Sequence, residues 1–352
     1  MARPDRSNEI DQALLIAVGA HPGDLVSAVG AQLGLSRARV GAQARSLVAG
    51  GFLEKAGTTR PRYALGAHRR FAHSYVREGL AEDRVWFDDL LPLLRHLPRN
   101  ILDIAHHGVT EMVNNAVDHS DASAVRVTMR ADATHLLFEV ADDGIGIFRR
   151  ITRALALPDE RLALLELAKG KLTTDPRRHS GEGIFFTSRM FDAFRIASGG
   201  LVFDRDAELD HDRLEDNDET VGTIVHMRIA GDSRRLAKAV FDQYSSGPDD
   251  YRFERTVVPV RLARVGDENL VSRSQAKRLL QRVERFRHVV LDFHGVSSLG
   301  QAFADEIFRV FASAHPEVEL VAANAMPAVQ QMIRRAEGLR EEQNGPLAPT
   351  DD

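Results

Sequence analysis

Residues 110–120 of this 352-residue chain read TEMVNNAVDHS and lie within a stretch of helical periodicity. Apolar residues recur at helical spacing between Asn100 and His119, so the sequence predicts one long helix with a face turned toward a core. Glu111, Asn115 and His119 follow one another at intervals of four, which places them on one side of that helix. The side is polar where an ordinary helix would carry alanine, leucine or lysine. We therefore expect it to serve a function.

The residues after this helix continue an order of strands and glycine turns. Strands are expected at AVRVTM and at HLLFEVAD, and the second runs directly into DDGIGI. Downstream, RHSGEGIFFTSRMFDAF places Gly181 and Gly183 just ahead of another amphipathic helix. Two further strands, FRIASGGLVF and GTIVHMRIA, are expected on either side of an acidic loop at residues 204–220. Each of these patterns alone is weak evidence for a particular domain, but the order in which they occur is much more specific evidence.

In this order the pieces resemble the GHKL or Bergerat-fold ATP-binding domain that gyrase, Hsp90, histidine kinases and MutL share. The resemblance covers residues 70–232 and implies ATP and Mg²⁺ as cofactors. Asn115 matches the asparagine that coordinates Mg²⁺, a hard cation that takes oxygen ligands and keeps several waters. Glu111 matches the acid that activates water in members that hydrolyse ATP, a general base. In members that transfer phosphate to protein, the same acid lies on the helix surface without that role.

The resemblance assigns the base-binding end of the site as well. Asp142 matches the carboxylate that reads the adenine amine, and Gly144 and Gly146 match glycines that let the backbone approach the base. Thr223 matches the threonine whose hydroxyl supports that aspartate. Asp143 is expected to be a solvated neighbour.

The phosphate-binding end falls on the second pair of glycines. Gly181 and Gly183 match backbone positions that receive phosphate oxygens at a helix N-terminus. The preceding stretch ELAKGKLTTDPRRHS resembles the lid that closes over nucleotide, although a solvated loop with scattered charges would look the same. Its candidate phosphate contacts are Lys169, Lys171, Arg177 and Arg178. His119, near the end of the long helix, is expected to orient nucleotide or to pack.

Residues 1–67 have the pattern of a winged helix-turn-helix. Short helices are expected at IDQALLIAVGA, DLVSAVGAQLG and RARVGAQARSLVAGG, followed by a strand, a turn and a strand in FLEKAGTTRPRYALG. Between Ser36 and Arg70 the chain has one acid, Glu54, and eight basic residues: Arg37, Arg39, Arg45, Lys55, Arg60, Arg62, Arg69 and Arg70.

This local excess of positive charge predicts DNA as a partner. Arg37 and Arg39, with Arg45 on the same helix, are expected to enter or flank a major groove, and Arg60 and Arg62 on the wing to contact phosphates. The alternative is a winged helix used for dimerisation or protein docking, with solvated arginines.

Residues 253–337 show a β-α-β-α-β-α order that indicates a small α/β domain. SRSQAKRLL, LDFHGV and AFADEIFRVF resemble the STAS-like domain that accompanies such ATP-binding domains in bacterial proteins, with Ser272 as a helix cap. A regulatory protein is the expected partner of this domain. Gln301 falls near the position of the phosphorylatable serine of anti-anti-sigma domains, so docking or dimerisation is favoured over a serine switch. The polar residues 338–352 are expected to be disordered.

The composition narrows the class of protein. A net charge of −5 argues against a protein that is basic throughout and coats nucleic acid. The absence of cysteine excludes disulfides, thiolate metal sites and cysteine nucleophiles. The start of the chain has no apolar signal core, and no apolar run is long enough to span a membrane, so a cytoplasmic protein is expected.

The sequence as a whole predicts an α+β multidomain protein: a winged helix-turn-helix, a Bergerat-fold α/β sandwich and a small STAS-like α/β domain. The expected function is that of an ATP- and Mg²⁺-binding, nucleotide-controlled regulator of transcription. Three alternatives stay open: an anti-sigma-type serine kinase, a slow ATPase, and an adaptor whose winged helix docks protein. Histidine autophosphorylation is not expected, because His106 and His107 lie in the helix of Asn115. A homodimer is compatible with this organisation.

Overall fold

The computed structural model describes residues 7–132, 134–172, 181–207, 212–247, 250–264 and 269–344. The chain divides into two compact units, which are described separately. The first comprises residues 1–147 and 187–237, and the second comprises residues 148–186 and 238–352. No helix in the described ranges is both long and apolar enough to cross a membrane.

The first unit begins with three helices and a hairpin. Helices α1 (Ser7–Ala17), α2 (Leu25–Leu33) and α3 (Arg37–Ala49) precede the antiparallel strands β1 (Leu53–Ala56) and β2 (Arg62–Leu65). Gly34 ends α2 in the left-handed conformation, and the Ser36 hydroxyl caps α3 by accepting from the Arg39 N–H. Leu14, Val29 and Val40 meet in the core of these elements.

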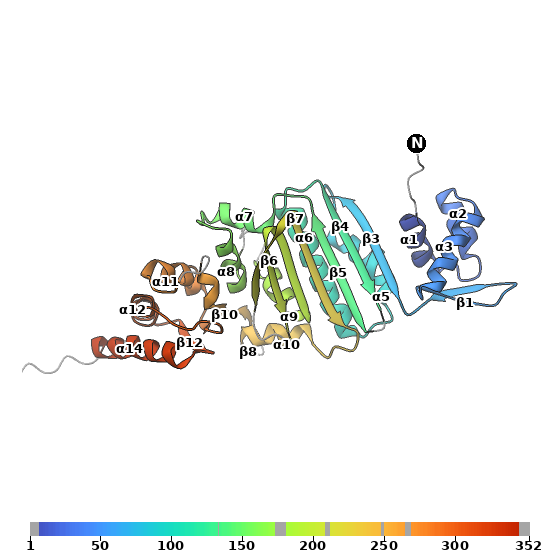
Figure 1. Ribbon diagram of the computed structural model, residues 1–352. Helices are drawn as coiled ribbons and strands as arrows, with labels where there is room; N and C mark the ends of the chain where they lie inside the picture. The colour runs from blue at the N-terminus through green and yellow to red at the C-terminus, as the bar shows by residue number, and fades with distance from the viewer. Residues whose placement is uncertain are drawn as a thin grey trace, which may run out of the picture. The chain divides into compact units, whose positions relative to one another are not determined.

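A five-stranded antiparallel sheet forms the centre of the first unit, in the order β3-β4-β5-β7-β6. Its strands are β3 (Arg69–Val76), β4 (Ala124–Ala131), β5 (His135–Asp142), β6 (Ala193–Asp206) and β7 (Arg213–Ala230). The long helix α6 (Arg99–His119) packs against one face of the sheet (Figure 1). Short helices α4 (Glu82–Arg84), η1 (Val85–Leu90) and α5 (Leu91–Leu94) lie between β3 and α6 in the sequence.

The buried face of the sheet follows from alternation along each strand. On β4, Val125, Val127 and Met129 are buried, while the residues between them point to the other face. Buried residues of α6, among them Ile104 and Val109, recur at helical spacing and complete the core.

The acidic loop expected at residues 204–220 is largely strand. β6 extends to Asp206 and β7 begins at Arg213, with Val202 paired to Glu215 and Leu201 to Asp216. The prediction of a loop was therefore wrong for most of this stretch, because pairing with β6 organises residues whose own composition favours a loop. Residues 208–211 lie outside the described part of the chain.

The second unit combines two separated parts of the chain. It contains α7 (Ile147–Ala154) from Phe148 onward, α8 (Arg161–Lys169) and the start of α9 (Gly183–Met190). From the later part come α10 (Ala237–Tyr244), and the short hairpin strands β8 (Ser245–Gly247) and β9 (Asp250–Phe253). Residues 148–186, which the sequence assigned to the ATP-binding domain, thus pack with C-terminal residues.

A three-stranded parallel sheet, β10-β11-β12, forms the centre of the second unit. β10 (Arg255–Pro259) is followed by η2 (Val260–Ala263), α11 (Arg273–Leu280) and η3 (Val283–Arg285) before β11 (His288–Asp292). Helices α12 (Gln301–Asp305), η4 (Glu306–Phe311) and α13 (Ala312–Ala314) then precede β12 (Glu319–Ala323) and α14 (Pro327–Asn344).

Two predictions for this unit have clear outcomes. Ser272 caps α11 in a reciprocal capping box with Gln275, as the sequence predicted. Helix α14 continues to Asn344, so the prediction of a disordered tail was wrong for residues 338–344. Residues 345–352 lie outside the described ranges.

Candidate functional site

The three polar residues of the opening stretch all lie on α6. Glu111, Asn115 and His119 occupy successive turns and are each half-buried. The Asn115 Nδ2 atom is buried and has no hydrogen-bond partner among the described residues. Because an unsatisfied buried amide costs free energy, this side chain is suited to gaining a partner from a ligand. The helix therefore presents an amide with unused binding capacity beside an acid and an imidazole.

The end of β5 supplies a half-buried carboxylate. Asp142 is the last residue of β5 and pairs with Thr223 on β7. Its Oδ1 accepts a hydrogen bond of 2.9 Å from the Gly144 N–H, and the Thr223 Oγ1 accepts one of 3.0 Å from the Ile147 N–H. The turn after β5 is thus fixed from both sides by side chains that the sequence singled out.

Burial sets the charge behaviour of Asp142. Removal from water raises the pKa of its carboxyl group from 3.8 to about 6, although hydrogen bonds from Gly144 and Thr223 favour the ionised form. The carboxylate is ionised at neutral pH and loses its charge just below. A partly buried carboxylate can accept a hydrogen bond from a ligand amine, and protonation near pH 6 would remove that acceptor.

Two glycines of this turn are required by its geometry. A Cβ atom at Gly144 would lie 2.1 Å from the Ser120 carbonyl oxygen at the end of α6. Gly146 has φ +86°, and a Cβ there would lie 2.6 Å from the Ser198 Oγ. The two glycines therefore let the turn pack closely against α6 and β6. Their approach to a base stays a prediction.

Asp143 is exposed, as the sequence predicted, and its carboxylate also holds local structure. Its carboxylate accepts hydrogen bonds from the Ser123 N–H (2.7 Å), the Ala124 N–H (3.0 Å) and the Ser123 hydroxyl. These bonds lower the pKa of the exposed Asp143 carboxyl group. Asp143 ties the end of β5 to the start of β4 and so holds the turn that carries Asp142.

The buried hydroxyl of Ser198 is a second supporting group that sequence reasoning missed. Its Oγ donates to the Gly222 carbonyl oxygen at 2.8 Å, next to Thr223. A serine in the stretch IASGG gives no local sign of this role, because its partner lies 24 residues further along the chain.

Lys169 and Lys171, the expected phosphate contacts, lie in the second unit. The Lys169 side chain is 1% exposed, and its Nζ donates to Glu166 Oε1 (2.6 Å), the Gln281 carbonyl (2.8 Å) and the Arg278 carbonyl (3.3 Å). Its three N–H groups are therefore used within the protein. A contact with phosphate would require this network to open, and that role stays a prediction.

Lys171 is bound less deeply. Its Nζ donates to the Arg285 carbonyl at 3.0 Å and lies 4.6 Å from the centre of the Phe286 ring. Burial lowers the pKa of this ammonium group from its ordinary value.

The second pair of glycines frames the expected lid. Gly181 has φ +73°, and its carbonyl accepts a 3.1 Å hydrogen bond from the Leu172 N–H. Gly183 is the first residue of α9, and the first N–H groups of an α-helix have no partner within the helix itself. Residues 173–180, including Arg177 and Arg178, lie outside the described part of the chain.

The five arginines expected to contact DNA lie on α3 and on the hairpin that follows it. Arg37, Arg45, Arg60 and Arg62 are exposed and Arg39 is half-buried, on α3, at the start of β2 and in the turn before it. None of the five side chains makes an ion pair with another described residue. Arg69 and Arg70 differ: Arg69 is buried, and its guanidinium donates to the Leu93 and His68 carbonyls, while Arg70 pairs with Asp11.

His106 and His107 lie in α6, as the sequence predicted. His106 stacks on Trp86 with ring centres 5.0 Å apart. Burial lowers the pKa of His107 to about 4, so it is neutral at physiological pH. Both residues contribute to packing.

Two family models match parts of the chain. The family model of a histidine kinase-like ATPase domain matches residues 58–202, and that of a STAS-like domain of unknown function matches residues 275–330. No curated protein matches the chain. Among solved structures, the crystal structure of Pseudomonas aeruginosa HmgR is 16% identical over 69% of this chain and 91% of that chain, with a TM-score of 0.17. A score this low supports no statement about the present fold. The chain therefore contains a histidine kinase-like ATPase domain followed by a STAS-like domain.

Proposed function

We propose that the protein is a nucleotide-controlled DNA-binding regulator, with ATP bound at the Asp142 turn and DNA bound by a winged helix formed from α1–α3 and the β1–β2 hairpin. The observation that carries the DNA-binding half is a set of five arginines on α3 and the hairpin that form no ion pair with any acid in the described part of the chain. A guanidinium that no carboxylate neutralises retains its full attraction for phosphate. The family match supports the nucleotide-binding half.

The residues present suit ATP with Mg²⁺. The Asp142 carboxylate would accept a hydrogen bond from the adenine amine. Asn115 would hold Mg²⁺ through its side-chain carbonyl oxygen, the atom of an amide that binds hard cations. The described residues contain no group of three acids or histidines arranged to hold a metal. One protein ligand with phosphates and waters is nevertheless enough for Mg²⁺, which when bound would neutralise phosphate charge.

Control by nucleotide requires a difference in affinity. ATP can change DNA binding only if it binds the DNA-competent state more or less tightly than the other state, and the coupling is reciprocal. We expect DNA affinity to change by about 5-fold or more on adding Mg-ATP, the lower end of usual coupling. Fluorescence anisotropy with labelled duplex, over a salt series, measures this change. Equal affinity with and without nucleotide would exclude the control.

The role of the hairpin arginines has its own test. Arg60→Ala with Arg62→Ala should lower the slope of log affinity against log salt by about 2, because each phosphate contact releases about one counterion. Arg95→Ala is the matched control, since Arg95 is an exposed arginine of the same unit outside α3 and the hairpin. A slope unchanged in the double variant would place DNA elsewhere or show that the winged helix docks protein.

A further inference from the structure

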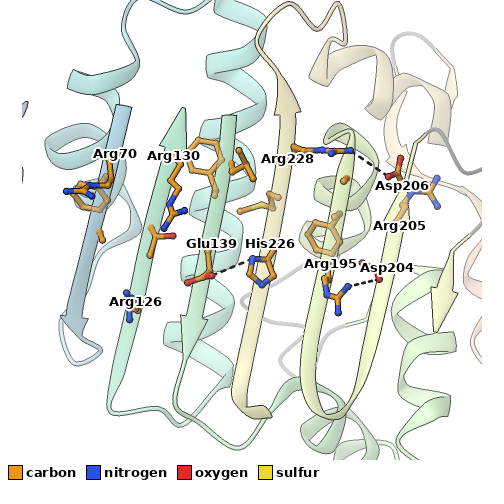
Figure 2. Close-up of a pocket in the computed structure, with 18 of the residues that line it drawn as sticks. Arg70, Arg126, Arg130, Glu139, Arg195, Asp204, Arg205, Asp206, His226 and Arg228 are labelled. Atoms are coloured by element: carbon orange, nitrogen blue, oxygen red, sulfur yellow. Dashed lines mark hydrogen bonds and ion pairs between the residues drawn. The ribbon is translucent and has the colours of Figure 1, made fainter. Parts of the chain in front are cut away.

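The face of the sheet opposite α6 carries several arginines. Arg126 and Arg130 of β4 alternate with buried residues and are exposed. Together with neighbouring strands they line a hollow of about 670 Å³. Figure 2 shows side chains of β3, β4, β5, β7 and β6 projecting from this side of the sheet. We call the following residues the arginine face: Arg70, Arg126, Arg130, Leu137, Arg195 and Arg228.

Three of these arginines lie in one row across the strands. Register pairs Arg70 with Arg130, Arg130 with Leu137, and Leu137 with Arg228. Like charges directly opposite each other in a sheet destabilise it, so this row costs free energy in the isolated protein. Arg70 is compensated by Asp11, and Arg228 lies 3.7 Å from Asp206. Arg130 has no acidic partner among the described residues.

The neighbouring row of side chains across the strands has almost no net charge. Glu139 lies 3.5 Å from His226, and Arg195 bonds Asp204 at 3.0 Å (Figure 2). The acids of the face therefore already have basic partners. The unpaired charge is that of Arg130 and of Arg126, which likewise has no acidic partner in the described chain. The face thus has a positive surplus concentrated on β4.

The centre of the arginine row points to a protein as the occupant. Leu137 is 41% exposed between Arg130 and Arg228. An apolar side chain ringed by arginines is typical of protein interfaces, whereas a nucleic acid backbone would leave the leucine unused. The aromatic residues that line the hollow, Phe71, Phe138 and Phe194, are at most 2% exposed and offer no surface for stacking bases.

The chain itself carries a matching segment, residues 215–221, which we call the acidic strand. Its sequence EDNDETV has four acids in five residues, all exposed, and ends in Val221, which is 74% exposed. Glu219 and Val221 are two residues apart, so an extended strand places them on one side, about 7 Å from each other. An acidic and an apolar side chain therefore lie next to each other on the acidic strand, as Arg130 and Leu137 do on the arginine face.

The acidic strand is held away from the arginine row of its own chain. Glu215 and Asp216 pair with Val202 and Leu201 in the β6–β7 ladder. The arginine row meets β7 at Arg228, 12 residues beyond Asp216 in the same strand. Only another copy can bring this segment to the row without breaking the ladder.

From this complementarity we propose that two copies of the chain associate, with the acidic strand of one seated on the arginine face of the other. Glu219 pairs with the unpaired Arg130, and Val221 covers Leu137. The contact does not depend on the proposed DNA binding.

Sedimentation equilibrium of the full chain over a salt series tests this. The wild-type protein should form dimers that weaken as salt rises, because the contact is charged. Arg130→Glu, and separately Glu215→Lys with Glu219→Lys, should each weaken association by about tenfold or more. An equimolar mixture of the two variants should regain association, because each reversed charge then meets its opposite. Arg95→Glu is the control and should associate as the wild type does.

Several results would overturn the proposal. One is a wild-type protein that stays monomeric up to about 100 µM, well above the dissociation constants of specific dimers. Another is that Arg130→Glu associates as strongly as Arg95→Glu. The third is that the mixture of the two variants associates no more tightly than either variant alone. Loss of DNA affinity in Arg130→Glu with self-association intact would identify nucleic acid as the occupant instead. Should Arg130→Glu fail to fold, the acidic-strand variant tests the same contact from the other side.

Discussion

Replacing Asp142 with asparagine is expected to weaken ATP binding by about 100-fold or more, because an amide NH₂ would face the adenine amine and a buried donor would lose its acceptor. Isothermal titration calorimetry of the wild type and the variant measures the change. Inosine triphosphate lacks the exocyclic amine and serves as the matched ligand. The wild type should prefer ATP to it, and Asp142→Asn should bind the two about equally. A variant that keeps the preference would show that Asp142 does not read the amine.

The same substitution should stabilise the protein without nucleotide. The folded state raises the pKa of Asp142 from 3.8 to about 6, so it binds this proton more tightly than the unfolded chain. The contribution of Asp142 to the free energy of unfolding therefore falls as pH rises from about 4 to about 6, and the full penalty remains above pH 6. Asp142→Asn removes it and should add about 2 kcal/mol at pH 7. Urea denaturation at pH 4 and pH 7 should show the gain only at the higher pH.

The second large effect is expected at the buried network of α8. Glu166 Oε1 accepts from Lys169 at 2.6 Å and Oε2 from Arg282 at 2.8 Å, with Glu166 and Lys169 at most 2% exposed. Burial lowers the pKa of both cations, which shows the cost of charging them here. Glu166→Ala leaves two buried cations without their shared anion and should destabilise the second unit by about 3–5 kcal/mol.

A surface pair provides the matched control for this network. Lys238 and Asp242 form an i,i+4 pair on α10 at 2.8 Å, with side chains 62% and 36% exposed. Asp242→Ala should cost less than about 0.5 kcal/mol. Glu166→Leu combined with Lys169→Met should recover much of the loss of Glu166→Ala, because it removes charge from both sides. Equal losses in Glu166→Ala and Asp242→Ala, measured by urea denaturation, would contradict a buried network that holds α8.

Local patterns predicted which residues come together in the turn after β5. Asp142, Gly144 and Thr223 were identified from short stretches, and the structure places the first two in one turn with Thr223 paired opposite. The hydrogen bonds of Asp143 could not be predicted from its own stretch, because Ser123 lies just before β4 and Ala124 begins it, and the register of two strands brings them to Asp143. The glycine-rich stretch that contains this carboxylate does not by itself indicate the register of the two strands.

Lys169 shows that local sequence patterns do not reveal interaction partners that lie far away in the chain. Its stretch, ELAKGK, has the charge of an exposed loop, and the residue that completes its network, Arg282, bonds Glu166 from 116 positions further on. The arginine face is the opposite case, because its local sequence pattern is clear. Alternation in AVRVTMRA is local and indicates one exposed side of β4, but its meaning depends on which strands lie beside it.

The assignment of residues 148–186 to the second unit has a consequence for synthesis of the protein on the ribosome. The Lys169 carbonyl accepts from Thr256 at 2.6 Å, and the Glu166 carboxylate needs Arg282. When α8 emerges, neither partner has been translated, and at about 5–20 residues per second Arg282 follows several seconds later. During that interval Glu166 and Lys169 remain hydrated and the helix has no fixed place. The middle of the ATPase domain therefore completes its contacts only after the C-terminal domain has been synthesised, so these two parts of the chain fold together.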